Sequence, residues 1–241
     1  MPAFHFSRTG RYTERVQVEI RRSARRRTVS LRVTRERIVL HAPTHVPEPD
    51  LMRWVEQKRT WIERARAEFA RRDPPTYALA DGEQLPFLGE VLTLRRGVCR
   101  SVRRAGDTLD VPDLPPARLM PLVQGWYRQQ ALAFFTSLAH AQAARLGRAP
   151  SAVKLTNART RWGSCTATGE LRFNWRVMTA PRHVAEYLCA HEVAHLRELN
   201  HSARFWRLVG QLMPEYAASR ATLRTEGWRY ALDLAPGTPE R

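Results

Sequence analysis

Residues 191–201 read His-Glu-Val-Ala-His-Leu-Arg-Glu-Leu-Asn-His, and this stretch organises the interpretation of the whole chain. On a helix, His191 and His195 lie four residues apart on one face, about 5 to 6 Å from each other, where both imidazoles can bind one metal ion. Glu192 is rotated by about 100° from His191, so its carboxylate lies beside the ion and can accept a proton from a water molecule. In a chain of this composition, roughly 0.02 such matches arise by chance.

A third histidine, His201, follows His195 by six residues. A continuous helix would carry it about 15 Å along the axis from His191, too far for a shared ion, so the chain must turn back. Asn200 is expected to end the first helix in a left-handed conformation, and Ser202 to cap the next helix, which extends to Pro214. Such a bend returns His201 to the metal as a third ligand.

The identity of the third ligand has an alternative. Glu215 or Glu226 from a downstream helix could complete a site of the two-His, one-Glu type in place of His201. We favour His201, because three neutral imidazoles with one open position describe a catalytic zinc ion, one per chain.

The segment before this helix predicts a small sheet. Residues 153–155 and 161–165 resemble short strands, and Gly169 marks a hairpin into residues 171–175. An unpaired edge near residues 171–176 would hold an extended peptide by main-chain hydrogen bonds. The polar side chains of that edge are therefore candidate substrate-binding residues: Arg172, Asn174 and Arg176. Pro181 is expected to open the helix that carries His191.

The remainder of the chain predicts further strands and two long helices. Alternating apolar residues predict an antiparallel meander within residues 16–40, and residues 47–72 have the period of one amphipathic helix. Short strands are expected within 84–111, and one long helix from 117 to 146, ended by Gly147. The Pro-rich break at residues 113–116 suggests two domains, 1–115 and 116–241.

The chain is strongly basic. Its 241 residues carry 40 Lys and Arg against 23 Asp and Glu, a net charge of +17, and all but Lys58 and Lys154 of the basic residues are arginines. A basic protein attracts polyanions, although a GC-rich genome also favours arginine. The densest cluster is a candidate phosphate-binding surface and comprises Arg21, Arg22, Arg25, Arg26 and Arg27.

Cysteine content and hydropathy indicate the cellular compartment in which the protein is expected. The three cysteines include no CxxC pair, so neither a disulfide framework nor a four-cysteine zinc site is expected. A buried, inert thiol is the expected state of Cys165, rather than a nucleophile. No signal peptide and no membrane-length apolar run is present in the sequence. We therefore expect a cytoplasmic protein with no membrane partner.

The motif HEVAHLRELNHSARFW at 191–206, preceded by RWGSC at 161–165 and by a strand containing Asn174, resembles the YgjP-like zinc metallopeptidases. The chain is more distantly similar to the SprT-like and WLM zincins. The resemblance is most specific over residues 155–215. It implies that His191, His195 and His201 are zinc ligands, that Glu192 is the general base, and that substrate lies extended along an edge strand. Glu198 stands where metzincins have a glycine, and no oxyanion stabiliser is identified.

Together these observations predict an α+β fold. A basic, strand-rich N-terminal region precedes a compact zincin-like domain with a long helix, a small antiparallel sheet, the HExxH helix and C-terminal helices. The predicted function is that of a zinc metalloendopeptidase, which hydrolyses peptide or protein substrates with a metal-activated water and Glu192 as general base. The alternative is a nucleic-acid-associated module, with the protease directed to DNA-bound proteins or with binding as the main activity. A zincin without turnover is disfavoured by the intact Glu192.

Overall fold

The structure, a computed structural model, describes residues 18–34, 37–71, 75–158, 160–230 and 232. The chain forms two compact units, Met1–Asp73 and Pro74–Arg241. Helices and small sheets occur in both, so the predicted α+β class is confirmed. The Pro-rich break at residues 113–116 falls inside the second unit, and a domain division there stays a prediction. No described helix combines the length and apolarity needed to cross a membrane.

The first unit is a three-stranded sheet with two helices: β1 (Val18–Ser23), β2 (Ser30–Val33), β3 (Ile38–Pro43), α1 (Glu48–Gln57) and α2 (Arg59–Arg71). The strand order is β1-β3-β2, with β1 parallel and β2 antiparallel to β3, so the predicted meander is wrong. Strand β3 is the central strand of this sheet, and nearly all of its residues are buried. The predicted single helix is divided at Lys58, and both helices contribute apolar side chains to the core of this unit.

The second unit begins with a four-stranded sheet of order β4-β5-β7-β6. Its strands are β4 (Gln84–Phe87), β5 (Glu90–Arg96), β6 (Arg103–Ala105) and β7 (Thr108–Val111). The predicted long helix follows as α3 (Pro116–Arg145), and Gly147 lies just beyond its end with a φ of 62°. A positive φ suits glycine at a helix terminus, because glycine has no side chain to clash.

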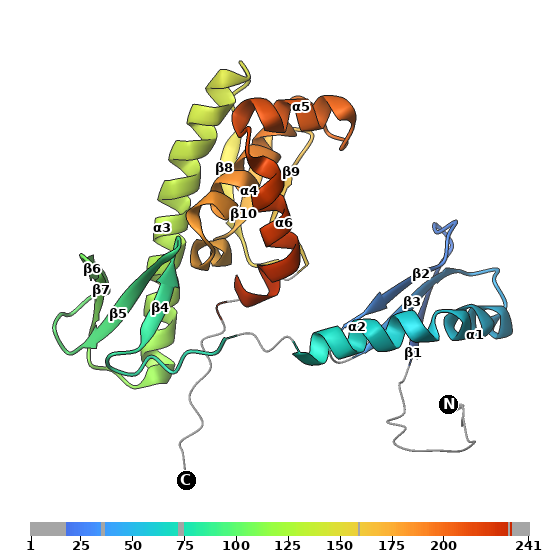
Figure 1. The fold of residues 1–241 in the computed structure, drawn as a ribbon, viewed down its shortest axis with the longest axis horizontal. Coiled ribbons are helices and arrows are strands. Elements are labelled where there is room, and N and C mark those ends of the chain that lie inside the picture. Colours follow the sequence, from blue (N-terminus) through green and yellow to red (C-terminus); the bar gives the residue numbers. More distant parts are fainter. Residues whose placement is uncertain (1–17, 35–36, 72–74, 159, 231, 233–241) are drawn as a thin grey trace, which may run out of the picture. The chain divides into compact units, whose positions relative to one another are not determined.

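A second small sheet and the last helices complete this unit (Figure 1). They are β8 (Ala152–Thr156), β9 (Gly163–Cys165), β10 (Glu170–Asn174), the 3₁₀ helix η1 (Trp175–Thr179), α4 (Arg182–Ala194), α5 (Ala203–Leu212), α6 (Tyr216–Glu226) and η2 (Gly227–Tyr230). The sheet was predicted to be antiparallel, but β8 pairs parallel with β10 and only β9 pairs antiparallel. The sheet is mixed because β9 joins β10 through a hairpin, whereas β8 lies on the opposite side of β10 and runs parallel to it.

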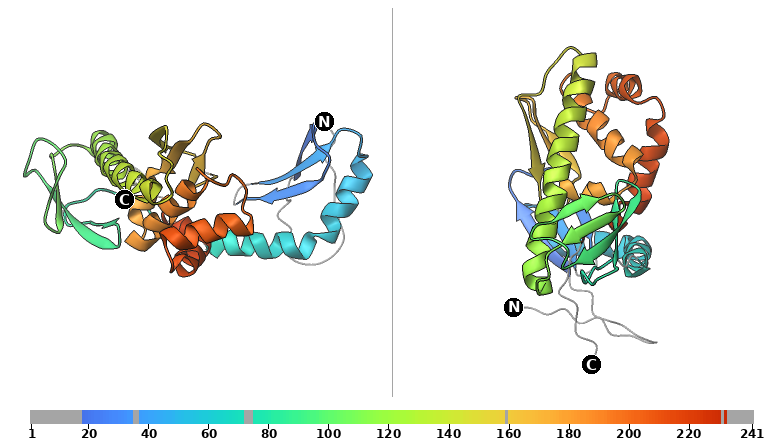
Figure 2. Two further views of the ribbon diagram at one scale, coloured as in Figure 1. Left: turned by 90° about the horizontal axis from the view of Figure 1, so that it is seen from above. Right: turned by 90° about the vertical axis from the view of Figure 1, so that its left-hand side faces the viewer.

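Helices α3 and α4 cover one face of this sheet. Helix α3 contacts β8, α4 contacts β9 and β10, and the two helices contact each other. The rings of Phe135 on α3 and Phe173 on β10 are both fully buried and stack with centroids 4.2 Å apart. On its other side, α4 contacts α5 and α6, so it lies between the sheet and the C-terminal helices (Figure 2). Helix α4 is therefore held on both sides.

Candidate metal centre

Helix α4 presents the first two histidines. It starts after Pro181, as predicted, and its apolar residues Val184, Leu188 and Val193 are buried against the rest of the unit. His191 lies in the last turn and His195 at the C-cap, and their ring centroids are 5.0 Å apart. The i,i+4 spacing thus brings both imidazoles to one face of a firmly packed helix.

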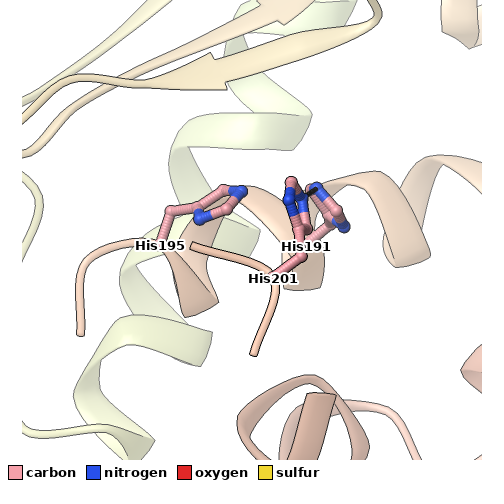
Figure 3. Close-up of side chains that lie close together, drawn as sticks. All are labelled: His191, His195 and His201. Atoms are coloured by element: carbon pink, nitrogen blue, oxygen red, sulfur yellow. Dashed lines mark hydrogen bonds between the residues drawn. The ribbon is translucent and has the colours of Figure 1, made fainter. Parts of the chain in front are cut away.

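The third histidine comes from the loop between α4 and α5. Backbone hydrogen bonds close the end of α4, and Ser202 caps α5 by accepting a hydrogen bond from the amide of Phe205 at 3.3 Å. Asn200 is not left-handed as predicted; its side chain instead accepts a hydrogen bond from the amide of Ser202. The loop brings Nε2 of His201 to 3.1 Å from Nε2 of His191 (Figure 3).

The three imidazoles form a compact set of ligand atoms. The centroid of the His201 ring lies 5.0 Å from that of His191 and 4.8 Å from that of His195. One nitrogen of each ring lies within 4.8 Å of the others. Nitrogen ligands bound at about 2.0 to 2.1 Å to one tetrahedral ion are about 3.4 Å apart, so the donor set fits a divalent metal with small adjustments. Among the described residues, neither Glu215 nor Glu226 belongs to this group.

Hydrogen bonds orient two of the rings. Nδ1 of His195 donates to the carbonyl oxygen of Glu198 at 2.9 Å, which leaves Nε2 as the free ligand atom. Nδ1 of His191 lies 3.4 Å from the hydroxyl of Tyr187, one helical turn earlier. The carbonyl contact selects the His195 tautomer in which Nε2 carries the lone pair, as metal binding requires, and the Tyr187 hydroxyl can accept from Nδ1 of His191 in the same tautomer.

Apolar and aromatic side chains surround the histidines. The ring of Phe205 is fully buried, and its centroid lies between 4.5 and 4.9 Å from those of all three imidazoles. Burial lowers the pKa of His191 to about 3, and it lowers the pKa of His195 as well. His191 and His195 are therefore neutral near pH 7, which is the state that binds a metal.

A further aromatic stack lies beside the metal centre. The Trp206 ring stacks on His201 with centroids 5.9 Å apart and on Tyr216 at 5.5 Å. The guanidinium of Arg220 lies 4.2 Å from the centroid of Trp206. This stack ties α5 to α6 and limits movement of His201.

Glu192 is buried against the strand β9. Its side chain is 4% exposed, and a Cβ atom placed on Gly163 would lie 2.5 Å from Oε1 of Glu192. A glycine is therefore required where the strand crosses this carboxylate. Burial raises the pKa of Glu192 to about 8, while the positive charge of Arg161 acts in the opposite direction. A carboxyl group tuned toward neutral pH is suited to proton transfer.

The prediction of an unpaired edge at residues 171–176 is wrong. Strand β10 is the central strand, with β8 on one side and β9 on the other. Of the three side chains predicted to bind substrate, Arg172 is exposed and pairs with Glu170, whereas Asn174 is buried and donates to the carbonyl of Ala158. Arg176 is half-buried in η1. Their role in substrate binding stays a prediction.

The edge strand beside Glu192 is β9. Within the described residues, no strand pairs with its second edge. The backbone N–H of Asn174 donates to the carbonyl of Trp162 at 2.7 Å, so these two residues form a hydrogen-bonded pair of the antiparallel ladder. Hydrogen-bonded pairs recur at every second residue, so Ser164 also directs its N–H and C=O groups toward β10. The N–H and C=O groups of Gly163 and Cys165 therefore point to the open edge.

Hollows lie at both ends of β9. One, with a volume of about 420 Å³, begins at its start and includes Arg161 and Trp162. The other, of about 300 Å³, lies at its end and includes Thr166 together with His195. Burial raises the pKa of the Cys165 thiol to about 11, which agrees with the prediction of an unreactive cysteine in this strand.

The five arginines predicted to bind phosphate differ in their contacts within the first unit. Arg22 donates hydrogen bonds to carbonyl oxygens that follow β3, including that of Val46 at 2.6 Å. Arg21 pairs with Glu19, and Arg26 donates to the hydroxyl of Ser30. Arg25 and Arg27 are exposed in the turn between β1 and β2.

Sequence reasoning missed several residues of the site. Tyr187 precedes His191 by one helical turn, so its position on the same face was available from the spacing. Gly163 lies in the RWGSC motif, but its proximity to Glu192 depends on how two distant segments pack. Phe205 and Trp206 carry the amphipathic period of α5, and this pattern alone does not distinguish a core residue from one beside a metal.

Comparison with known proteins found one matching family model and one similar solved structure. The family model described as "YgjP-like, metallopeptidase domain" matches residues 27–226, most of the chain. Among solved structures, the metallopeptidase zymogen abylysin of Pyrococcus abyssi is similar over 42% of this chain and 99% of its own, with 18% identity and a TM-score of 0.35. The search of curated proteins found no match.

Proposed function

Because the chain belongs to the YgjP-like metallopeptidase family, we propose that it is a zinc-dependent endopeptidase. The carrying observation is the convergence of three imidazole nitrogens within 4.8 Å beside the buried carboxylate of Glu192. His191, His195 and His201 would hold the ion. When bound, zinc supplies a Lewis acid for the scissile carbonyl and acidifies water.

Glu192 performs the proton transfer in this proposal. Its carboxylate accepts the proton of the attacking water and delivers it to the nitrogen of the leaving amine. The desolvated position under Gly163 supports this role, because a carboxyl group with a raised pKa can both take up and release a proton near pH 7. The charge of Arg161 limits that rise and keeps a fraction of the group ionised.

Strand β9 binds the peptide in this proposal. The outward N–H and C=O groups of Gly163 and Cys165 offer main-chain hydrogen bonds to an extended chain. Hollows at both ends of the strand leave room for side chains on both sides of the scissile bond. An extended chain bound at an open edge supports cleavage inside a chain, with loose sequence preference.

The test uses the zinc-loaded protein and a mixture of quenched fluorescent peptides. Glu192→Gln is expected to bind one zinc ion but to lose activity by at least about 100-fold, the lower range for general acid–base catalysis. Glu186→Gln is the matched control, because it makes the same change on α4 at a side chain that pairs with Arg182 and lines neither hollow. Equal turnover by wild type and Glu192→Gln would refute the proposal.

A second function, nucleic-acid binding by the first unit, is favoured by its charge distribution. Residues 18–43 carry eight arginines against two glutamates, whereas residues 48–71 carry six basic and five acidic residues. The basic excess thus lies in the segment from β1 to β3, including the turn between β1 and β2. Arg25, Arg27 and Arg32 are exposed, and no carboxylate of the described chain pairs with them.

Salt dependence tests this second function. Binding of a fluorescent DNA or RNA oligonucleotide should weaken steeply with salt, and the triple change of Arg25, Arg27 and Arg32 to Gln should lower the log–log slope by roughly 2 to 3. The matched control changes Arg53, Arg59 and Arg64 on the helices. Equal slopes in both variants, or no binding at low salt, would remove this function.

A further inference from the structure

The hollow at the start of β9, here called the arginine hollow, is lined by cationic side chains. Arg161, Arg176 and Arg224 all contribute to it, and neither an aspartate nor a glutamate is among its described lining residues. These arginines come from the segment before β9, from η1 and from α6. Three separate segments therefore converge to place like charges around one space of about 420 Å³.

Arg161 and Arg224 both line this space, and like charges without a counter-ion cost free energy unless a ligand supplies the opposite charge. Arg161 and Arg224 are exposed, and within the described chain no acidic side chain forms an ion pair with either. The guanidinium of Arg176 lies 4.6 Å from the ring centroid of Trp175, which fixes its direction. Arg161 and Arg224 thus offer donors for an anionic group.

The walls of the arginine hollow are apolar. Trp162 and Trp228 line it, together with Leu223 and Leu232. A Cβ atom on Gly227 would lie 3.3 Å from Nε1 of Trp162, so the indole packs closely on the backbone of η2 and is held in place. An apolar wall together with cationic groups fits a short aliphatic side chain that ends in a carboxylate.

The arginine hollow is one residue along the chain from the strand that contacts Glu192. Trp162 lines the hollow, and the next residue, Gly163, lies against Glu192. The Cα atoms of Trp162 and Gly163 are about 3.8 Å apart, as for any two consecutive residues. The charge of Arg161 also acts on Glu192. A peptide paired with β9 would therefore pass the opening within a few residues of its scissile bond.

We propose that the arginine hollow binds an acidic side chain of the peptide substrate, which makes acidic sequences the preferred substrates. This inference rests on the proposed peptidase function. The glutamate or aspartate would lie within three residues of the scissile bond, on one side of it. Its carboxylate would form charge-assisted hydrogen bonds with Arg224 and Arg161, while its aliphatic stem contacts Trp162.

The first experiment profiles cleavage of a proteome-derived peptide library by the zinc-loaded enzyme. Asp and Glu should be enriched at one position near the cleaved bond, by about fivefold or more over their frequency in the library. Arg224→Glu should abolish this enrichment or replace it with Lys and Arg. The control is Arg118→Glu on α3, which contributes no residue to the hollow and should keep the acidic preference. Cleavage with no acidic enrichment, or enrichment unchanged in Arg224→Glu, would overturn the inference.

The second experiment measures binding without turnover. Zinc-loaded Glu192→Gln is titrated with a labelled decapeptide in which Glu alternates with Ala, and with its Gln–Ala counterpart. The acidic peptide should bind about tenfold more tightly, which corresponds to one hydrogen-bonded charge. Arg224→Glu should remove this difference, while Arg118→Glu, which alters the net charge equally, should retain it. If the acidic preference is retained but wild type cleaves nothing, the proposed peptidase fails while the hollow stands; equal affinities would refute the hollow alone.

Discussion

The carboxylate of Glu192 lies against the backbone of Gly163 so closely that a single added methyl group would fall 2.5 Å from Oε1 and 2.7 Å from Cγ. The two residues are on α4 and β9, the elements that the sheet-on-helix packing brings together. The general base proposed here is therefore positioned by an edge strand as well as by its own helix.

Gly163→Ala should separate catalysis from metal binding. The new methyl group displaces the Glu192 side chain, and a shift of about 1 Å at a catalytic group costs on the order of 100-fold in rate. The three atoms nearest to the new methyl group all belong to Glu192 and none to a histidine, so one zinc ion per chain should remain. Peptidase rate and metal content by mass spectrometry are measured together. Full activity in this variant would mean that Glu192 does not act from the observed position.

Three histidine variants test the ligand set. His191→Ala, His195→Ala and His201→Ala should each weaken zinc binding by more than about 100-fold, because each removes a direct ligand. Glu215→Gln and Glu226→Gln should bind zinc as the wild type does. Competition with a chelator of known affinity provides the measurement. Normal affinity in His201→Ala combined with a loss in either glutamate variant would reassign the third ligand.

Tyr187→Phe should reduce zinc affinity modestly. The change removes the hydroxyl that lies 3.4 Å from Nδ1 of His191 but keeps the ring. Loss of a partner that orients a ligand weakens metal binding by about tenfold, and the length of this contact favours the lower part of the usual range. Tyr216→Phe is the control, because this neighbouring ring stacks on Tyr187. A Co²⁺-substituted absorption spectrum that shifts in Tyr187→Phe but not in the control would support the assignment.

The folding stability of the metal-free protein should depend on pH through Glu192. The folded state raises the pKa of this group from 4.5 to about 8, so the folded protein binds the proton more tightly than the unfolded chain. Its contribution to stability is therefore complete below about pH 4.5 and is lost as pH rises toward 8. In chelator, the melting temperature of Glu192→Gln should exceed that of wild type by an amount that grows across this range. A constant difference between the two proteins would contradict the raised pKa.

The sequence by itself determined the elements that local spacing governs. His191 and His195 share a helix face because four residues make about one turn, and Ser202 caps α5 because its hydroxyl reaches the amide three residues on. The long helix α3 ends where Gly147 allows a positive φ. The bend that returns His201 to His191 was also predicted, because a straight helix would carry His201 about 15 Å along the axis, too far to share an ion.

The tertiary structure alone decided the strand order and what it places beside the metal centre. Alternation of apolar residues defines the faces of a strand but not its neighbours, so β10 was expected at an edge and is central, and β1 was expected in a meander and pairs with β3. The contact of Gly163 with Glu192 and the convergence of Arg161, Arg176 and Arg224 join segments far apart in the chain. Such contacts depend on the packing of whole elements, which no local spacing in the sequence encodes.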